Sequence, residues 1–156
     1  MAASSSTSHP SLNYDVFISF KPEDTRRIFV GHLHKALQMK AINAFIDSNE
    51  LHNSDEDPSE VLEAVADSRL SVVVLSKHYA SSKWCLKELV KIMECMKSVK
   101  QIVVPVFYEV DRSDIRSLES SFEEGFGKYD REEVRRWKSA LFEVAGLSGW
   151  DSRNYR

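Results

Sequence analysis

The chain has 156 residues, of which 42% are hydrophobic and 29% are charged, a balance typical of globular rather than disordered proteins. This length predicts one domain that buries about 70% of the surface its unfolded chain exposes. The net charge is −3, and Lys and Arg are scattered among Asp and Glu, which argues against a nucleic-acid partner. No window has the length of an apolar membrane span.

The ends of the chain and its cysteines constrain the organisation further. Residues 1–11 are rich in Ala, Ser and Thr and lack the apolar centre of a secretory signal, so we expect a disordered leader. The domain is expected over residues 12–151, followed by a tail over 152–156. Cys85 and Cys95 lie about 15 Å apart along one expected helix, which is too far for a disulfide. Buried thiols in a reducing cytosol are therefore expected.

The chain begins with a predicted strand and helix. Residues 14–20 (YDVFISF) are aromatic and β-branched and predict the first strand. The polar segment 21–27 predicts a loop in which Asp24 or Thr25 caps a helix. That helix ends near Lys40, and its inner face carries Phe29, Val30, Leu33 and Leu37.

The middle of the chain predicts two more strands and the helix between them. Residues 44–46 predict a short second strand, and the polar residues 47–58, which show no regular period, predict a long loop. Ser59 is the expected cap of the next helix, whose apolar positions are Val61, Leu62 and Val65. Residues 70–75 are almost continuously Val and Leu, which indicates a third strand buried on both faces of a parallel sheet.

The second half repeats the strand and helix pattern. The third helix runs to about Lys97, and its buried stripe carries Leu86, Leu89, Val90 and Met93. Residues 102–108 predict a fourth strand, in which Pro105 indicates an irregularity or a place toward the sheet edge. Residues 111–130 predict loop and short helix.

The last predicted helix is amphipathic. Its apolar positions are Val134, Trp137, Leu141, Val144 and Ala145, and Gly146 ends it. The segment 147–156 adds one short fifth strand.

This order of elements predicts an α/β fold, a flavodoxin-like three-layer αβα sandwich with a parallel sheet of about five strands in the order 2-1-3-4-5. Ligands of such sheets bind beyond the carboxyl ends of strands one and three, where the order reverses. The loop 21–26 and the segment that carries Ser82, Trp84 and Glu88 should therefore meet at one crevice. Glu88 follows Trp84 by four residues at the border of a buried stripe, so its carboxylate is either a solvated edge charge or a working group.

Several common sites are disfavoured by the residues. The loop after strand one contains no glycine, which argues against a phosphate cradle. His32 and His34 are two apart on a helix and cannot face one metal, and no other ligand cluster has the spacing of a metal site. Strand three ends without the carboxylate of a phosphoacceptor, and Ser19 and Ser82 lack the glycine elbow of a hydrolase nucleophile.

Four segments carry a family resemblance. They are YDVFISF with EDTR within residues 14–26, residues 71–76, YASSKWCLKEL at 79–89 and VPVFY at 104–108. Over roughly Tyr14 to Trp150 the chain resembles a plant TIR domain. Such domains stand alone or form the N-terminal signalling module of nucleotide-binding, leucine-rich-repeat immune receptors.

The resemblance implies an enzyme that cleaves the nicotinamide–ribose bond of NAD+ or NADP+ to make ADP-ribose-type signals in innate immunity and cell death. It places the catalytic glutamate on Glu88, where a carboxylate can stabilise or attack an oxocarbenium-like ribose. Trp84 would offer a ring face to the base or the pyridinium, and Lys21 and Arg26 would hold the pyrophosphate. The full implied set of substrate-binding residues is Lys21, Pro22, Glu23, Asp24, Thr25, Arg26, Ser54, Ser82 and Trp84.

The resemblance also implies partners and a location. Other TIR domains would associate through a face that includes Gly31 and His32, and association would raise activity; receptor domains are further partners in a longer chain. NAD+ or NADP+ would be the substrate, with no separate cofactor, metal or membrane. The implied location is the cytoplasm first and the nucleus second.

Two loops depart from the family pattern and keep a second hypothesis open. Lys21-Pro22 stands where the family usually has Arg-Gly, and residues 52–57 (HNSDED) lack the usual Arg-Gly pair. Both changes favour a non-catalytic TIR interaction module, whereas Glu88, Trp84 and Arg26 favour the enzyme. Nicotinamide release measured against protein concentration separates the two.

Overall fold

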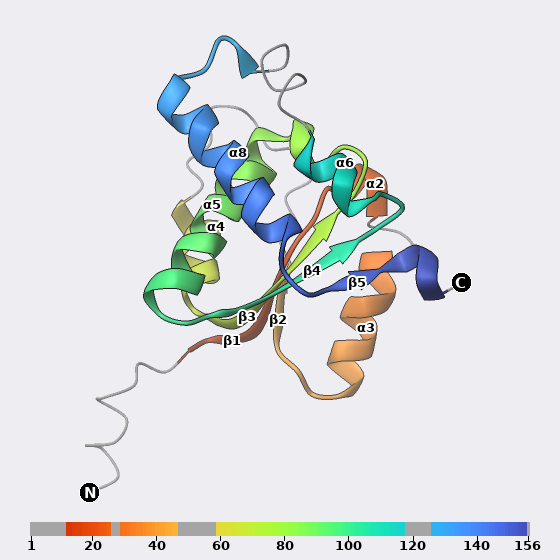
Figure 1. Ribbon diagram of the computed structural model, residues 1–156. Helices are drawn as coiled ribbons and strands as arrows, with labels where there is room; N and C mark the ends of the chain where they lie inside the picture. The colour runs from red at the N-terminus through yellow and green to blue at the C-terminus, as the bar shows by residue number, and fades with distance from the viewer. Residues whose placement is uncertain (1–11, 26–28, 47–58, 118–125, 156) are drawn as a thin grey trace, which may run out of the picture.

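The computed structural model describes residues 12–25, 29–46, 59–117 and 126–155 (Figure 1). The expected leader, the loop 47–58, Arg26 and Ser54 lie outside these residues. The elements in chain order are β1 (Tyr14–Ser19), α2 (Pro22–Thr25), α3 (Gly31–Met39), β2 (Ala44–Ile46), α4 (Ser59–Ala66), β3 (Ser68–Leu75), the 3-10 turn η2 (Tyr79–Ser81), α5 (Lys83–Ser98), β4 (Ile102–Phe107), α6 (Arg112–Arg116), α8 (Arg131–Ala145), β5 (Trp150–Asp151) and the 3-10 turn η3 (Ser152–Tyr155).

The sheet has five parallel strands in the order β2-β1-β3-β4-β5, which confirms the predicted architecture. The register pairs Ser19 of β1 with Val73 of β3, and Leu75 of β3 with Phe107 of β4. The carboxyl ends of β1 and β3 are therefore neighbours at the point where the strand order reverses. This is where the topology places a ligand site.

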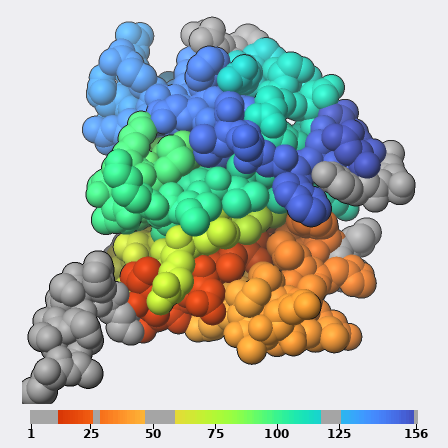
Figure 2. Space-filling model, turned by 60° about the horizontal axis from the view of Figure 1, so that its bottom comes forward, coloured from red at the N-terminus to blue at the C-terminus, as the bar shows by residue number. Residues whose placement is uncertain are grey.

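Helices cover both faces of the sheet, because neighbouring residues of each buried strand point to opposite faces. Phe17 and Val73 belong to a core shared with α4, α5 and α8. Ile18 and Val74 belong to a second core, closed by Val30 and the apolar side of α3. The orange α3 and the blue α8 accordingly lie on opposite sides of the strands (Figure 1; Figure 2). The predicted burial of the third strand on both faces is confirmed.

Most predicted elements agree with the structure to within one or two residues, but the loop after β1 differs. Asp24 and Thr25 do not cap the following helix; they lie within the short α2, and the side chain of Asp24 bonds to the segment after β3. A capping preference is a local signal, and a partner 54 residues away in the chain overrides it.

Pro105 causes no irregularity in β4, because the register with β3 continues through the pair of Val73 and Pro105. The alternative holds, since β5 pairs with β4 only from Val106 onward, which leaves Pro105 near the sheet edge. Among the described residues, no helix is long and apolar enough to cross a bilayer.

Candidate active site

Three segments meet at the carboxyl ends of β1 and β3: the end of β1 with α2, the turn η2, and the first two turns of α5. Ser82 is the N-cap of α5, and its Oγ accepts a hydrogen bond from the Cys85 amide at 3.3 Å. This cap sets where α5 begins. It thereby directs Glu88, six residues further along, back toward the end of β1.

Glu88 is buried, with 5% of its surface exposed. Its Oε1 accepts a hydrogen bond of 2.8 Å from Oγ of Ser19, the last residue of β1. Of the two alternatives that the spacing left open, the solvated edge charge is therefore wrong. A buried carboxylate is costly unless it is hydrogen-bonded, and carboxylates kept in such places are frequent at functional sites.

Tyr79 extends this contact. Its hydroxyl lies 2.7 Å from Oγ of Ser19 and 3.2 Å from the carbonyl oxygen of Cys85, and Ser19 and Tyr79 are fully buried. Burial raises the pKa of Tyr79 well above its ordinary value, and electrostatic interactions with Cys85 and Glu88 add to that rise. Tyr79 is therefore a neutral phenol with one proton to donate.

Asp24 ties α2 to the end of β3. Its Oδ2 accepts hydrogen bonds from the hydroxyl of Ser76 and the backbone amide of His78, and its Oδ1 lies 2.7 Å from the His78 ring Nδ1. Burial alone would raise the pKa of Asp24, but the hydrogen bonds from Ser76 and His78 together bring it below its ordinary value. Both oxygens of this predicted substrate-binding residue therefore have partners within the protein.

The other predicted residues of this loop are placed differently from one another. Pro22 opens α2, where its missing amide costs nothing. Nζ of Lys21 lies 3.0 Å from Oε2 of Glu23, on the partly exposed side of the loop. Thr25 is 1% exposed, and its hydroxyl donates to the carbonyl of Lys21 at 3.3 Å. Lys21 and Glu23 thus remain accessible, whereas Thr25 faces inward.

Trp84 and Cys85 are both largely withdrawn from solvent. Trp84 is 8% exposed. The ammonium groups of Lys83 and Lys87 lie 5.9 and 5.7 Å from the centroid of its ring. Such contacts show that the ring face attracts cations. Burial raises the pKa of the Cys85 thiol, and Glu88 raises it further, so this sulfur is not a thiolate nucleophile.

Gly31 and His32, the predicted association residues, are exposed in the first turn of α3. No residue of α3 is fully buried, and Met39 at its end is 80% exposed. This surface lies on the side of the sheet opposite α5 and α8, as Figure 1 shows.

A separate cavity of about 680 Å³ lies next to the start of α8, and the described residues that line it include none of the predicted site residues. Among its lining side chains are Tyr129, Arg131, Arg135 and Lys138. Arg135 is paired with Glu132 at 3.1 Å on an exposed face, so this cavity is an open surface groove.

Four further residues contact the predicted site residues among those the structure describes, and the sequence did not predict these contacts: Ser19, Ser76, His78 and Tyr79. From sequence, Ser19 is weighed only as a hydrolase nucleophile, for which the glycine elbow is missing. A usable signal was nevertheless present, because Ser19 is a small polar residue at the carboxyl end of an otherwise apolar buried strand, where parallel sheets carry functional groups.

Comparison with known proteins identifies the family of this chain. A family model described as the TIR domain matches residues 13–156. The chain is 48% identical over 155 residues to disease resistance protein RPV1 of Vitis rotundifolia, a match that covers 95% of this chain and 11% of RPV1. It is 45% identical over 155 residues to TMV resistance protein N of Nicotiana glutinosa, covering 96% of this chain and 13% of N. The chain thus spans about a tenth of the length of these relatives.

A solved structure matches over nearly the whole chain. The TIR domains of the activated Roq1 resistosome, which directly recognises the pathogen effector XopQ, align with a TM-score of 0.80 at 48% identity, over 92% of this chain and 90% of that one. A matched family model and relatives near half identity make the assignment. This chain belongs to the TIR domain family and, within it, to the TIR domains of plant disease resistance proteins.

Proposed function

We propose that this TIR domain is a glycohydrolase that cleaves the nicotinamide–ribose bond of NAD+ or NADP+ and releases nicotinamide and an ADP-ribose-type product. The observation that carries the proposal is Glu88, a buried carboxylate at the carboxyl ends of β1 and β3, held by Ser19. A carboxylate in a low-dielectric site is suited to a reaction that develops positive charge on a sugar.

The chemistry needs only one carboxylate. As the C–N bond breaks, the electron pair leaves with nicotinamide, which is neutral once released, and the ribose carbon becomes oxocarbenium-like. Glu88 stabilises that charge or bonds to the carbon, and water then supplies the hydroxyl of the product while a proton is released. Because the leaving group departs neutral, no general acid is required.

The loop after β1 would hold the phosphates. Lys21, together with Arg26, supplies cationic donors to the pyrophosphate, and Lys21 would exchange its partner Glu23 for a phosphate. The contacts of Asp24, Thr25 and Ser82 favour a role in holding the loop and the start of α5. Ser54 and Trp84 stay proposed substrate contacts, the latter through its cation-attracting ring.

The test is nicotinamide release by the purified chain, alone and forced into oligomers. We expect Glu88→Gln to lower turnover by about 100-fold or more, the scale of losing a positioned catalytic group. Glu94→Gln is the matched control, because Glu94 lies on the same helix but is exposed. Equal release by wild type and Glu88→Gln at every concentration would rule out the glycohydrolase.

The second candidate is a non-catalytic module that binds other TIR domains. It is favoured by the exposed surface of α3 with Gly31 and His32, and by the assembled TIR domains of the Roq1 resistosome. Self-association is part of both candidates, so only the nicotinamide measurement separates them. We place the activity in the cytoplasm and the nucleus, in the service of plant immunity and cell death.

A further inference from the structure

We infer that Ser19 and Tyr79 are positioning residues for Glu88, and that their hydroxyl groups form a directed hydrogen-bond chain ending on its carboxylate. This inference rests on the proposed catalytic role of Glu88. Neither hydroxyl touches the substrate in this proposal; both act through Glu88.

The direction of the hydrogen-bond chain follows from counting the protons that each hydroxyl can donate. A carboxylate only accepts, so the single proton of Ser19 goes to Oε1 of Glu88 across 2.8 Å. The oxygens of Ser19 and Tyr79 are 2.7 Å apart, so one of them must donate, and only the proton of Tyr79 is left. The longer 3.2 Å contact of Tyr79 with the Cys85 carbonyl is then secondary. The order is Tyr79 to Ser19 to Glu88.

The hydrogen-bond chain joins three parts of the fold. Ser19 ends β1, Tyr79 lies in η2 after β3, and Glu88 lies on α5. Ser19 and Tyr79 have no exposed surface, so bulk water does not replace a lost hydroxyl. Buried hydrogen bonds in series polarise one another and hold one geometry, which is what a carboxylate beside a reacting carbon needs.

These hydrogen bonds also affect the charge of the Glu88 carboxyl group. A hydrogen bond to the charged form of a carboxylate favours that form. Among the described residues, the titratable groups that interact electrostatically with Glu88 include Tyr79 and Cys85, and Lys21 acts on Cys85 from the loop after β1. Removing the donor Ser19 should therefore favour neutral Glu88, which cannot stabilise a cationic transition state.

The experiment compares Ser19→Ala and Tyr79→Phe with the matched control Ser71→Ala. Ser71 is also fully buried, lies on the neighbouring strand β3, and donates to Oε1 of Gln101 at 2.9 Å, away from Glu88. For each variant, kcat and KM for nicotinamide release are measured from about pH 4 to 8, a range that begins near the ordinary glutamate pKa of about 4.3.

We expect Ser19→Ala to lower kcat by about 10- to 100-fold, the size of a lost hydrogen bond to a charged group, and to change KM little. The acid limb of the kcat–pH profile of Ser19→Ala should move to higher pH. Tyr79→Phe keeps the ring, should fold, and should show the same changes more weakly. Ser71→Ala should keep the kcat and the pH profile of wild type.

A second readout does not depend on activity. With 13C-labelled glutamate, the Glu88 carboxyl signal, assigned by its loss in Glu88→Gln, should titrate at higher pH in Ser19→Ala and in Tyr79→Phe than in wild type. If Ser19→Ala does not fold, Tyr79→Phe decides alone. An unmoved titration, or a kcat loss no larger than that of Ser71→Ala, overturns the inference while leaving a Glu88-dependent glycohydrolase in place. Wild-type turnover in Glu88→Gln overturns the proposed function itself.

Discussion

Asp24 and His78, 54 residues apart in the chain, hold the segment after β1 against the segment after β3. The His78 amide donates to Oδ2 of Asp24 at 2.7 Å, and the ring Nδ1 lies 2.7 Å from Oδ1. Lys21 and Glu23 lie on the same short segment as Asp24. This contact therefore sets the position of Lys21, the proposed phosphate-binding residue, and of its partner Glu23.

Asp24→Asn should destabilise the protein by about 1–3 kcal/mol at pH 7, because hydrogen bonds to a charged acceptor are lost. The pKa of Asp24 is lowered below its ordinary value of 3.8, so its contribution is present above that pH and is lost as the pH falls through the lower, folded-state pKa. The difference in the free energy of unfolding between wild type and Asp24→Asn, measured in urea, should thus have its whole value at pH 5 and decrease below about pH 4. The control is Asp130→Asn, at an exposed position, which should show no such difference. A difference for Asp24→Asn that persisted at low pH would contradict the stabilising role of ionised Asp24.

Gln101→Leu should cost about 3 kcal/mol or more, because it removes partners from buried groups. Nε2 of Gln101 donates to the carbonyls of Val65 and Ser68, both at 2.8 Å, and its Oε1 accepts from Ser71. The side chain thereby joins the end of α4 to the starts of β3 and β4. Ser71→Ala removes one of these bonds and should cost about 1 kcal/mol in the same denaturant titration. Equal costs for the two variants would contradict this account.

Gly149→Ala should destabilise the protein by about 1–3 kcal/mol, as overpacking of a closed site does. A Cβ on Gly149 would lie 2.1 Å from the carbonyl oxygen of Pro105, which is backbone and cannot move aside. Gly146→Ala is the matched control: its nearest atom is the end of the Arg116 side chain at 2.9 Å, and Gly146 has helical dihedral angles. Thermal unfolding should show a marked loss for Gly149→Ala and a small change for Gly146→Ala. The reverse order would show that β5 does not approach β4 as described.

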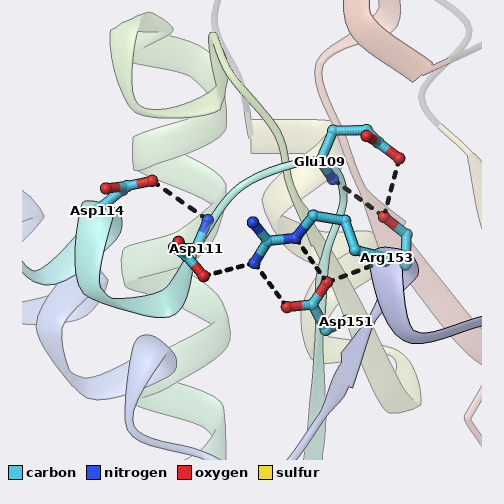
Figure 3. Close-up of polar contacts among 6 residues, drawn as sticks. Glu109, Asp111, Asp114, Asp151 and Arg153 are labelled. Carbon is cyan, nitrogen blue, oxygen red and sulfur yellow. Dashed lines mark hydrogen bonds and ion pairs between the residues drawn. The ribbon is translucent and has the colours of Figure 1, made fainter.

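Arg153→Lys should loosen the C-terminal segment. Figure 3 shows the Arg153 guanidinium between Asp111 and Asp151, with Nε and Nη2 bonded to Asp151 and Nη2 also to Asp111. The hydrogen bonds that Arg153 donates to Asp151 and then to Asp111 raise the pKa of Arg153 above its ordinary value. A lysine keeps the charge but lacks the planar fork that bridges two carboxylates. Hydrogen exchange of amides 150–155 should become faster, whereas Arg135→Lys, at an exposed pair, should leave it unchanged.

Gly31→Arg should weaken self-association without unfolding the domain, because it adds bulk and charge to an exposed position of α3. If activity depends on assembly, nicotinamide release should require higher protein concentration. Ala66→Arg is the control, since it makes the same change at an exposed position of α4, which packs on the other face of the sheet. Sedimentation velocity of the three proteins measures the association. Equal association of Gly31→Arg and wild type would exclude this face.

The order of the elements could be predicted from sequence, because periodicity is local and because few topologies satisfy alternating strands and helices. The short β2 over residues 44–46, the end of α8 just before Gly146 and the meeting of β1 and β3 all agree with the structure. The same local argument failed at Asp24. Its capping preference is real, but its partners lie after β3 and outweigh it.

By itself the sequence determined the fold class, the neighbouring carboxyl ends of β1 and β3, and the position of Glu88 near them. Only the tertiary structure decided that Glu88 is buried and that Ser19 and Tyr79 hold it. The physical reason is that the spacing of residues along one helix reports which face a side chain occupies. The hydroxyl that meets that side chain comes from a strand 69 residues earlier, and its position depends on sheet register and side-chain rotamers that no local pattern records.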